Sequence, residues 1–172
     1  MALTYIDGDV VRSPEKYIAH GCNAQGRMGK GIAKQIRDDY PEAYRVYRDE
    51  YEAGNLSLGT IVPVPCRHPI HGDKTIINAI TQEFYWKQGE PKSRFVDYDA
   101  VRACFQNINA LAIMTQDDSE LADMFSGPLT RLAINKIGSD LAGGDWSIIE
   151  QIIEEESKDF ETVVYLFIPS AG

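Results

Sequence analysis

The sequence predicts an α/β domain in which helices cover a mostly parallel β-sheet. Short runs of β-prone residues alternate with segments whose apolar residues recur at helical spacing. Glycine-rich or polar loops follow several of the predicted strands, and sheets of this kind bind ligands at the carboxyl ends of their strands. The chain has 172 residues, 44% hydrophobic and 25% charged, which is typical of one globular domain. We therefore expect residues 1–172 to form a single domain with its site in those loops.

In the first half of the chain, strands are expected at residues 3–6, 17–19, 60–65 and 74–80. Turn-forming or polar residues follow the first two, and Pro63 and Pro65 mark the third as an edge strand or a strand end. The spacing of apolar residues after Gly31 predicts a helix. Pro41 can open a second helix, which ends near Gly54.

In the second half, the clearest helix carries one apolar stripe from Tyr98 to Ala112, with Asp97 as its expected cap. Residues 115–129 resemble an acidic connector with at most a short helical turn. Residues 131–137 favour a buried strand, and a helix is expected to open near Asp145. Residues 162–168 favour a final strand.

The charge distribution limits the possible ligands. The net charge of −9 argues against a general nucleic-acid binder, because such proteins present a basic surface to phosphates. Residues 1–114 carry 14 basic and 14 acidic side chains, whereas residues 115–172 carry 3 and 12. Four cations, at positions 27, 30, 34 and 37, lie in one glycine-rich stretch. An anionic ligand is therefore expected there.

The cysteines and the hydropathy pattern bear on the cellular setting. Cys22, Cys66 and Cys104 are odd in number and lack the close pairing of a disulfide or zinc framework. The first residues show no signal-peptide pattern, and no apolar run approaches the length of a membrane span. These features favour a soluble cytoplasmic protein that needs neither disulfides nor a structural metal.

The first candidate site is the glycine-rich turn at residues 26–31, which passes directly into a helix. Glycines allow backbone N–H groups to approach a ligand, and the start of a helix favours an anion. The turn therefore has the features of a phosphate-binding loop, although it matches neither the Walker nor the dinucleotide-binding pattern. A tight strand-to-helix turn without a ligand is the alternative.

A second glycine-rich loop, residues 137–146, also lies between a predicted strand and a predicted helix. Two such loops could bind the two phosphates of one diphosphate through backbone N–H groups. Because these donors need little side-chain charge, an acidic protein can still bind this anion. The alternative for this loop is a helix capped by Asp145.

Three smaller constellations have both a chemical and a structural interpretation. Asp9, after the first strand, can accept a hydrogen bond from an exocyclic amine such as that of adenine, or simply form a turn with Gly8. His20 and Cys22 share one face of a strand. A Cys-His nucleophile is conceivable, but His20 as a general acid or base is favoured.

The third constellation contains Cys66, His68 and His71, all possible zinc ligands. A fourth ligand at a sensible spacing is missing, so a polar connection between the two strands of a hairpin is the alternative.

Three motifs together resemble a macrodomain: residues 23–33, Gly8-Asp9-Val10 upstream, and residues 137–146 downstream. Their order and spacing match, and the resemblance runs over residues 3–168. It is closest to the branch of ADP-ribose 1″-phosphate phosphatases and their phage and bacterial relatives. The resemblance implies a three-layer α/β/α fold with a mixed, mostly parallel sheet and ADP-ribose lying across the strand ends.

The resemblance also assigns residues. Asp9 would hold the adenine amine, Val10 would contact adenine through its backbone, and Asn23 would contact the distal ribose. The two diphosphate loops would be Gly29, Lys30, Gly31, Ile32 and Ala33, and Ser139, Asp140, Leu141, Ala142 and Gly143. The expected binding site also includes Gly8, Gly21, Cys22, Met28, Ile137 and Gly138. His20 carries over as a catalytic candidate, and Asp145 is a second candidate whose alternative role is to cap the last helix.

Two departures from the family bear on mechanism. The glutamate-deacylating branch has a catalytic lysine where residues 80–83 stand, and Gln82 cannot form a covalent adduct with an opened ribose. Asp140 stands where related sequences usually carry glycine, so its carboxylate would either repel phosphate or supply a base.

The expected activity is hydrolysis of ADP-ribose 1″-phosphate to ADP-ribose and phosphate, without metal or cofactor. The alternatives are a non-catalytic reader of ADP-ribose or ADP-ribosylated proteins, an ADP-ribosyl ester hydrolase, and a metal-dependent hydrolase using Cys66, His68 and His71. A monomer with no nucleic-acid or membrane partner is expected.

Overall fold

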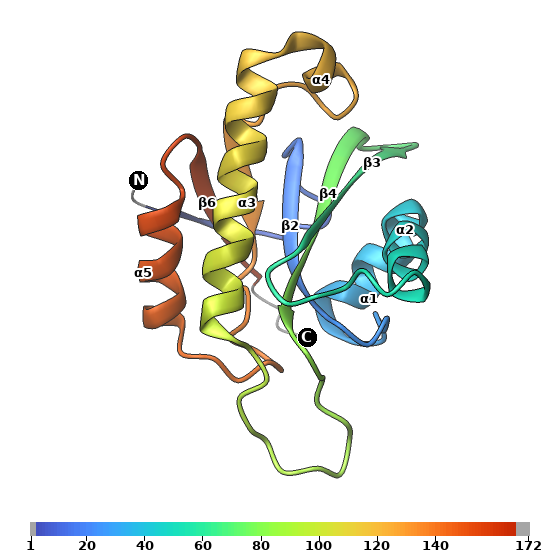
Figure 1. Cartoon of the computed structure of the whole chain (residues 1–172), viewed down its shortest axis with the longest axis vertical. Coiled ribbons are helices and arrows are strands. Elements are labelled where there is room, and N and C mark those ends of the chain that lie inside the picture. Colours follow the sequence, from blue (N-terminus) through green and yellow to red (C-terminus); the bar gives the residue numbers. More distant parts are fainter. Residues whose placement is uncertain (1–2, 168–172) are drawn as a thin grey trace.

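A computed structural model describes residues 3–167 (Figure 1). Its sheet has six strands, in the spatial order β1-β6-β5-β2-β4-β3. The strands are β1 (Thr4–Asp7), β2 (Tyr17–Asn23), β3 (Ile61–His68), β4 (Gly72–Gln82), β5 (Arg131–Ile134) and β6 (Glu161–Leu166). All neighbours run parallel except β3, which is antiparallel to β4 at the edge. The predicted mixed, mostly parallel sheet is confirmed, and the edge position explains how Pro63 and Pro65 are tolerated.

Helices cover both faces of this sheet (Figure 1). The helices α1 (Gly31–Asp39) and α2 (Pro41–Glu52) lie on one face, and α3 (Tyr98–Asp117) and α5 (Trp146–Glu156) lie on the other. Alternate residues of β2 enter separate cores: Ile18 packs with the first helix pair and Ala19 with the second. These two cores make the fold three-layered, as the resemblance implied.

The helices form where the sequence predicted them. The Asp97 carboxylate accepts a hydrogen bond from the Ala100 N–H at 2.9 Å, which confirms the expected cap of α3. However, α3 continues to Asp117 and is followed at once by α4 (Ser119–Asp123), so much of the predicted connector is helical. Buried Thr115 stabilises this extension, because its hydroxyl donates to Leu111 O and accepts from Leu129 N.

Strand boundaries differ more from the prediction. Strand β2 continues to Asn23, through residues expected to turn, because its backbone stays paired with β4. Strands β3 and β4 are longer than predicted, and β5 ends at Ile134 instead of residue 137. The last predicted strand is β6, and the final residue of that prediction, 168, lies outside the described residues. None of the helices in the described part is long and apolar enough to cross a membrane.

Candidate functional site

The loops that follow β1, β2 and β5 meet at one edge of the sheet, because these strands are parallel. They enclose a cleft with two halves. The β1 half is lined by Gly8, Asp9 and Val10, and the β2 half by residues 20–23 and their neighbours. Both halves include Gly31, Ile32, Asn135, Lys136 and Asp140 in their walls. The two halves therefore adjoin along these residues.

Most of the predicted site residues line this cleft. They are Gly8, Asp9, Val10, His20, Gly21, Cys22, Asn23, Gly29, Lys30, Gly31, Ile32, Ala33, Ile137, Gly138, Asp140, Leu141 and Ala142. Met28, Ser139, Gly143 and Asp145 are not among its lining residues. Met28 is 1% exposed and belongs to the core, and the Ser139 hydroxyl donates to Lys136 O within its own loop.

Sequence reasoning missed several lining residues. The additional ones are Gln35, Gln82, Tyr85, Trp86, Asn135, Lys136, Tyr165, Leu166 and Phe167. Tyr85 and Trp86 lie on the loop between β4 and α3, which forms the long projection at the bottom of Figure 1. The run Phe84-Tyr85-Trp86 was the available signal, since three consecutive aromatic residues in a polar loop are unusual.

The start of α1 forms one wall of the cleft. Gly31 has φ of +59°, a conformation that favours glycine, and Lys30 at the N-cap makes no side-chain capping bond. The first turn of a helix has N–H groups without intrahelical partners. The N–H groups of residues 31–33 are therefore free of intrahelical partners in the wall of the cleft, where the sequence predicts an anion site. The Lys30 ammonium lies 4.7 Å from the centre of the Trp86 ring.

The second glycine-rich loop also lines the β2 half of the cleft. Gly138 has φ of +78°, and an added Cβ there would lie 2.8 Å from a methyl of Val96. Within the described residues, the N–H groups of Gly138, Asp140, Leu141 and Ala142 have no hydrogen-bond partner. Two separate segments with unpaired backbone donors thus line the same half of the cleft.

The β1 half contains the Asp9 carboxylate. One of its oxygens accepts a hydrogen bond from the Val11 N–H at 3.0 Å, which leaves the other oxygen for a ligand. Asp9 thus takes part in a turn and also lines the β1 half of the cleft, where the sequence predicts its contact with a ligand.

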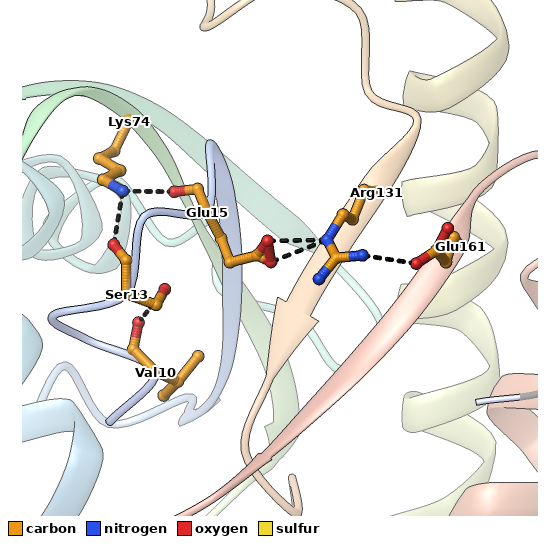
Figure 2. Close-up of polar contacts among 6 residues, drawn as sticks. All are labelled: Val10, Ser13, Glu15, Lys74, Arg131 and Glu161. Atoms are coloured by element: carbon orange, nitrogen blue, oxygen red, sulfur yellow. Dashed lines mark hydrogen bonds and ion pairs between the residues drawn. The ribbon is translucent and has the colours of Figure 1, made fainter. Parts of the chain in front are cut away.

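A polar network fixes the loop that carries Asp9 (Figure 2). The buried Lys74 ammonium donates to the backbone oxygens of Ser13 and Glu15 at 2.7 and 2.6 Å. The Glu15 carboxylate accepts from Arg131, which also pairs with Glu161. This network connects residues 8–16 to strands β4, β5 and β6. Burial lowers the pKa of Lys74 from its ordinary value.

Lys74→Met is therefore expected to lower the free energy of unfolding by about 2–3 kcal/mol, because two buried carbonyl groups lose their donor. Binding to the β1 half should weaken as well, since the Asp9 loop loses its attachment. Urea unfolding and calorimetric titration with ADP-ribose would measure the two effects. Lys158→Met, at an exposed lysine, is the control. Wild-type stability in Lys74→Met would contradict the assigned role.

Asn23 organises the β2 half. Its amide oxygen accepts from the Gln25 N–H and the Tyr47 hydroxyl at 2.9 and 3.0 Å, and its amide nitrogen donates to Arg27 O at 2.9 Å. Only one amide hydrogen is used in these bonds, so the second remains for a ligand. Asn23 thus shapes the loop beside the cleft and also lines the cleft.

His20 is buried at the base of this half. Its Nε2 lies 2.6 Å from the amide oxygen of Asn78, so Nε2 carries the proton and donates it. Burial lowers the pKa of His20 to about 4, and the ring is neutral at pH 7. An imidazolium acid, one of the roles expected from the sequence, is therefore disfavoured, because burial penalises the charged form of the ring.

Cys22 lies on the same face, with its sulfur 3.6 Å from His20 Nε2. A Cys-His nucleophile also needs a third group that orients the histidine, and Asn78 is in the place to do so. Burial raises the pKa of the Cys22 thiol well above its ordinary value, so the thiolate needed for nucleophilic attack is disfavoured.

The neutral state of His20 predicts a pH dependence of stability. Its pKa rises from about 4 in the folded chain toward 6.5 on unfolding, so the unfolded state binds more protons between these values. The stabilisation is complete above pH 6.5 and is lost as pH falls toward 4, by about 3 kcal/mol in total. Urea unfolding from pH 7.5 to 4.5 would measure this loss, and His20→Gln should reduce it. A His20 imidazole NMR signal, identified by its absence in His20→Gln, that titrates near pH 6.5 in the folded protein would contradict this prediction.

Two other candidate sites have structural roles. The Asp145 carboxylate accepts from the backbone and hydroxyl of Ser147 and caps α5, which is the alternative stated for it. His68 Nδ1 accepts from the N–H groups of Ile70 and His71, which closes the β3–β4 hairpin. Cys66 is buried, and no three His, Cys, Asp or Glu side chains in residues 3–167 are placed to hold a metal ion.

Comparisons with known proteins agree with this geometry. The chain matches the Macro domain family over residues 19–153. It is 29% identical to an ADP-ribose 1″-phosphate phosphatase of Candida glabrata, over 94% of this chain and 96% of that protein. It is 26% identical to a DNA ADP-ribosyl glycohydrolase of Mycobacterium bovis, over 99% of this chain but 43% of that protein. The DarG macrodomain of Mycobacterium tuberculosis superposes with a TM-score of 0.76 at 23% identity, covering 98% of each chain.

Proposed function

Because the chain belongs to the macrodomain family, we propose that it binds ADP-ribose derivatives and hydrolyses the terminal phosphate of ADP-ribose 1″-phosphate. One observation supports this most strongly: two separate segments whose backbone N–H groups are unpaired line the same half of the cleft. A diphosphate needs such donors and little side-chain charge. The named activity of the C. glabrata relative, which matches almost end to end, supports the choice of substrate.

In this proposal the ligand lies along the whole cleft. Adenine occupies the β1 half, where the free oxygen of Asp9 accepts from its amine and Val10 provides backbone contact. The diphosphate lies between α1 and the second glycine-rich loop, and the distal ribose contacts Asn23 in the β2 half. Asp140 lines both halves, so its carboxylate lies beside this path.

Hydrolysis requires water to attack the terminal phosphorus while the bond between phosphorus and the 1″ oxygen breaks. The proton lost by water ends on the departing oxygen, and the products are ADP-ribose and phosphate. Backbone donors in the β2 half stabilise the charge that develops. We assign His20 to positioning, because its ring holds Asn78 and is buried. No metal takes part in this scheme.

A phosphorus NMR time course with ADP-ribose 1″-phosphate tests the proposal. Free phosphate growing beyond one equivalent of protein is the expected result. Broadened diphosphate signals without release would indicate a reader of ADP-ribose and overturn the hydrolytic step. Unchanged spectra would overturn the binding assignment as well.

A second candidate is release of ADP-ribose from a macromolecule. It is favoured by the β2 half, where Arg27 and Tyr85 line both the cleft and an adjoining groove, so a substituent on the distal ribose has an exit. The M. bovis relative is named for such a reaction. Gln82 cannot replace the catalytic lysine of the glutamate-deacylating branch, so this route would need activated water.

The proposal also covers the organisation of the chain. One sheet with two cores supports a single domain over residues 1–172. Three cysteines present as free, buried thiols support a reducing, cytoplasmic setting. Size-exclusion chromatography tests the expected monomer.

A further inference from the structure

The two halves of the cleft differ in the charge of the side chains that line them. The β2 half is lined by three basic residues and one acidic residue, which are Arg27, Lys30, Lys136 and Asp140. The β1 half is lined by Lys136 and by two acidic residues, Asp9 and Asp140. The β2 half is thus the more basic of the two, in a chain whose net charge is −9. The proposed hydrolysis uses backbone N–H groups and gives the cationic side chains of this half no role.

Lys30 differs from the next cations along α1 in the partner of its charged group. The Lys34 ammonium pairs with the Asp38 carboxylate at 2.9 Å, and the Arg37 guanidinium lies 3.8 Å from the same carboxylate. Within residues 3–167, Lys30 forms no ion pair, and its ammonium instead lies 4.7 Å from the centre of the Trp86 ring. A ring face attracts an ammonium but does not neutralise it. The charge of Lys30 therefore remains available to an anion in the β2 half.

The loop that carries Trp86 is attached at both ends to segments that contribute to the cleft. At its start, the N–H of Ala24, which follows β2, donates to Glu83 O at 3.2 Å. At its end, the Phe95 N–H donates to the backbone oxygen of Ala142, in the second glycine-rich loop, at 2.7 Å. Trp86 lies between these two attachments and lines the β2 half. Backbone bonds, and not only the contact with the ammonium, therefore define the place of the ring.

We propose that the Lys30 ammonium, positioned by the Trp86 ring, binds the terminal phosphate of ADP-ribose 1″-phosphate and makes the chain prefer this ligand to ADP-ribose. The inference rests on the proposed function, which puts the distal ribose beside Asn23 in the β2 half. That ribose carries the terminal phosphate, and Lys30 and Trp86 line the β2 half but not the β1 half. A phosphate monoester carries a charge of about −1.5 to −2 at pH 7. An ammonium has three N–H donors, so it can contact the ring and the phosphate at the same time.

The two other cations of the β2 half are less suited to this role. Arg27 also lines the adjoining groove, and Lys136 also lines the β1 half, so each lies at a boundary of the β2 half. Asp140 lines the same two halves as Lys136, and its negative charge opposes an anion there. Lys30 lines the β2 half only, and its preference for an anion is therefore confined to the part of the cleft proposed for the distal ribose.

Calorimetric titration with ADP-ribose and with a 1″-phosphonate analogue of ADP-ribose 1″-phosphate, which cannot be hydrolysed, tests this preference. The wild-type chain should bind the analogue at least about tenfold more tightly than ADP-ribose, as one charge-assisted contact implies. Lys30→Met should remove the preference, and Lys30→Arg, which keeps the charge, should retain most of it. Trp86→Leu should lower the preference about threefold. Lys34→Met, which removes the same charge one turn further along α1 and outside the cleft, is the matched control and should keep it.

Tryptophan fluorescence gives a second measurement that does not depend on turnover. The chain has two tryptophans, of which Trp86 lines the cleft and Trp146 does not. Comparison with Trp86→Leu isolates the emission of Trp86, which responds to charge near its ring. The analogue should change this emission more than ADP-ribose does, and Lys30→Met should remove the difference.

Three results would overturn the inference: equal affinity of the wild type for the two ligands, an unchanged preference in Lys30→Met, or an equal loss in Lys34→Met. Binding of ADP-ribose without preference for the analogue would leave the proposed binding in the cleft intact and reject only the role of Lys30. If neither ligand binds, the proposed function itself fails, and the inference fails with it.

Discussion

Gly143→Ala is expected to weaken ADP-ribose binding at least about 100-fold, which corresponds to about 2.7 kcal/mol. Gly143 does not line the cleft, but it closes the loop that presents the second set of N–H donors. Its φ is +72°, and an added Cβ would lie 2.5 Å from the backbone oxygen of Ser93. Ser93 lies in a segment held in place by bonds from Phe95 and Val96 to Ala142 O. The loop must therefore move, and its donors move with it.

Gly54→Ala separates the overlap from the backbone strain. Gly54 has φ of +76° and nothing within 4 Å of an added Cβ. Both substitutions cost about 1–2 kcal/mol of stability through the left-handed conformation, but only Gly143→Ala displaces the loop. Calorimetric titration with ADP-ribose and urea unfolding of both variants measure the difference. Equal affinities in the two variants would show that the loop does not position the diphosphate.

Local sequence patterns predicted the layout of the fold well. Helical periodicity and caps such as Asp97 depend on neighbours within one turn, so the sequence contains all the information needed. Strand ends were less predictable, because they depend on partners distant in sequence. His20 and Cys22 follow β-prone residues but resemble a turn, and they remain in β2 because their backbone pairs with Asn78 and Ile80.

The part of the candidate site that consists of backbone N–H groups was predictable from the sequence. Glycines in the loops after β2 and β5 predicted both sets of N–H donors, and Gly31 and Gly138 adopt φ of +59° and +78°, which glycine tolerates best. The direction of a side chain relative to the site was not visible. A period of two placed His20 and Cys22 on one face but did not reveal that this face is buried against α2, where Asn78 donates to Ala43 O.

Contacts between distant segments account for the rest. The sequence alone would place Lys74 and Glu15 on the surface. In the structure their hydrogen bonds hold the loop that carries Asp9 against β4, β5 and β6. Tyr85 and Trp86 line the cleft together with Arg27, although they are about 60 residues away from it in the sequence.

Asn23→Ala is expected to lower kcat/KM for ADP-ribose 1″-phosphate by about 10²–10³-fold, or about 3–4 kcal/mol of transition-state stabilisation. The substitution removes the amide hydrogen available to the distal ribose. It also leaves the Gln25 N–H without its acceptor and Arg27 O without its donor, whereas the buried Tyr47 hydroxyl keeps its bond to the backbone oxygen of residue 23. The loop at residues 23–27 then loses the conformation that shapes the β2 half.

Asn109→Ala is the matched control for this loss. Its amide also makes both kinds of bond, donating to the Asp159 carboxylate and accepting from the Asp159 N–H at 2.8 Å each, on α3 and outside the cleft. Phosphate release measured at several substrate concentrations, together with urea unfolding, compares the two variants. Asn109→Ala should lose stability and keep its kcat/KM. If Asn23→Ala loses stability to the same extent but also keeps its kcat/KM, Asn23 only supports the loop, and the distal ribose must be held by other groups of the β2 half.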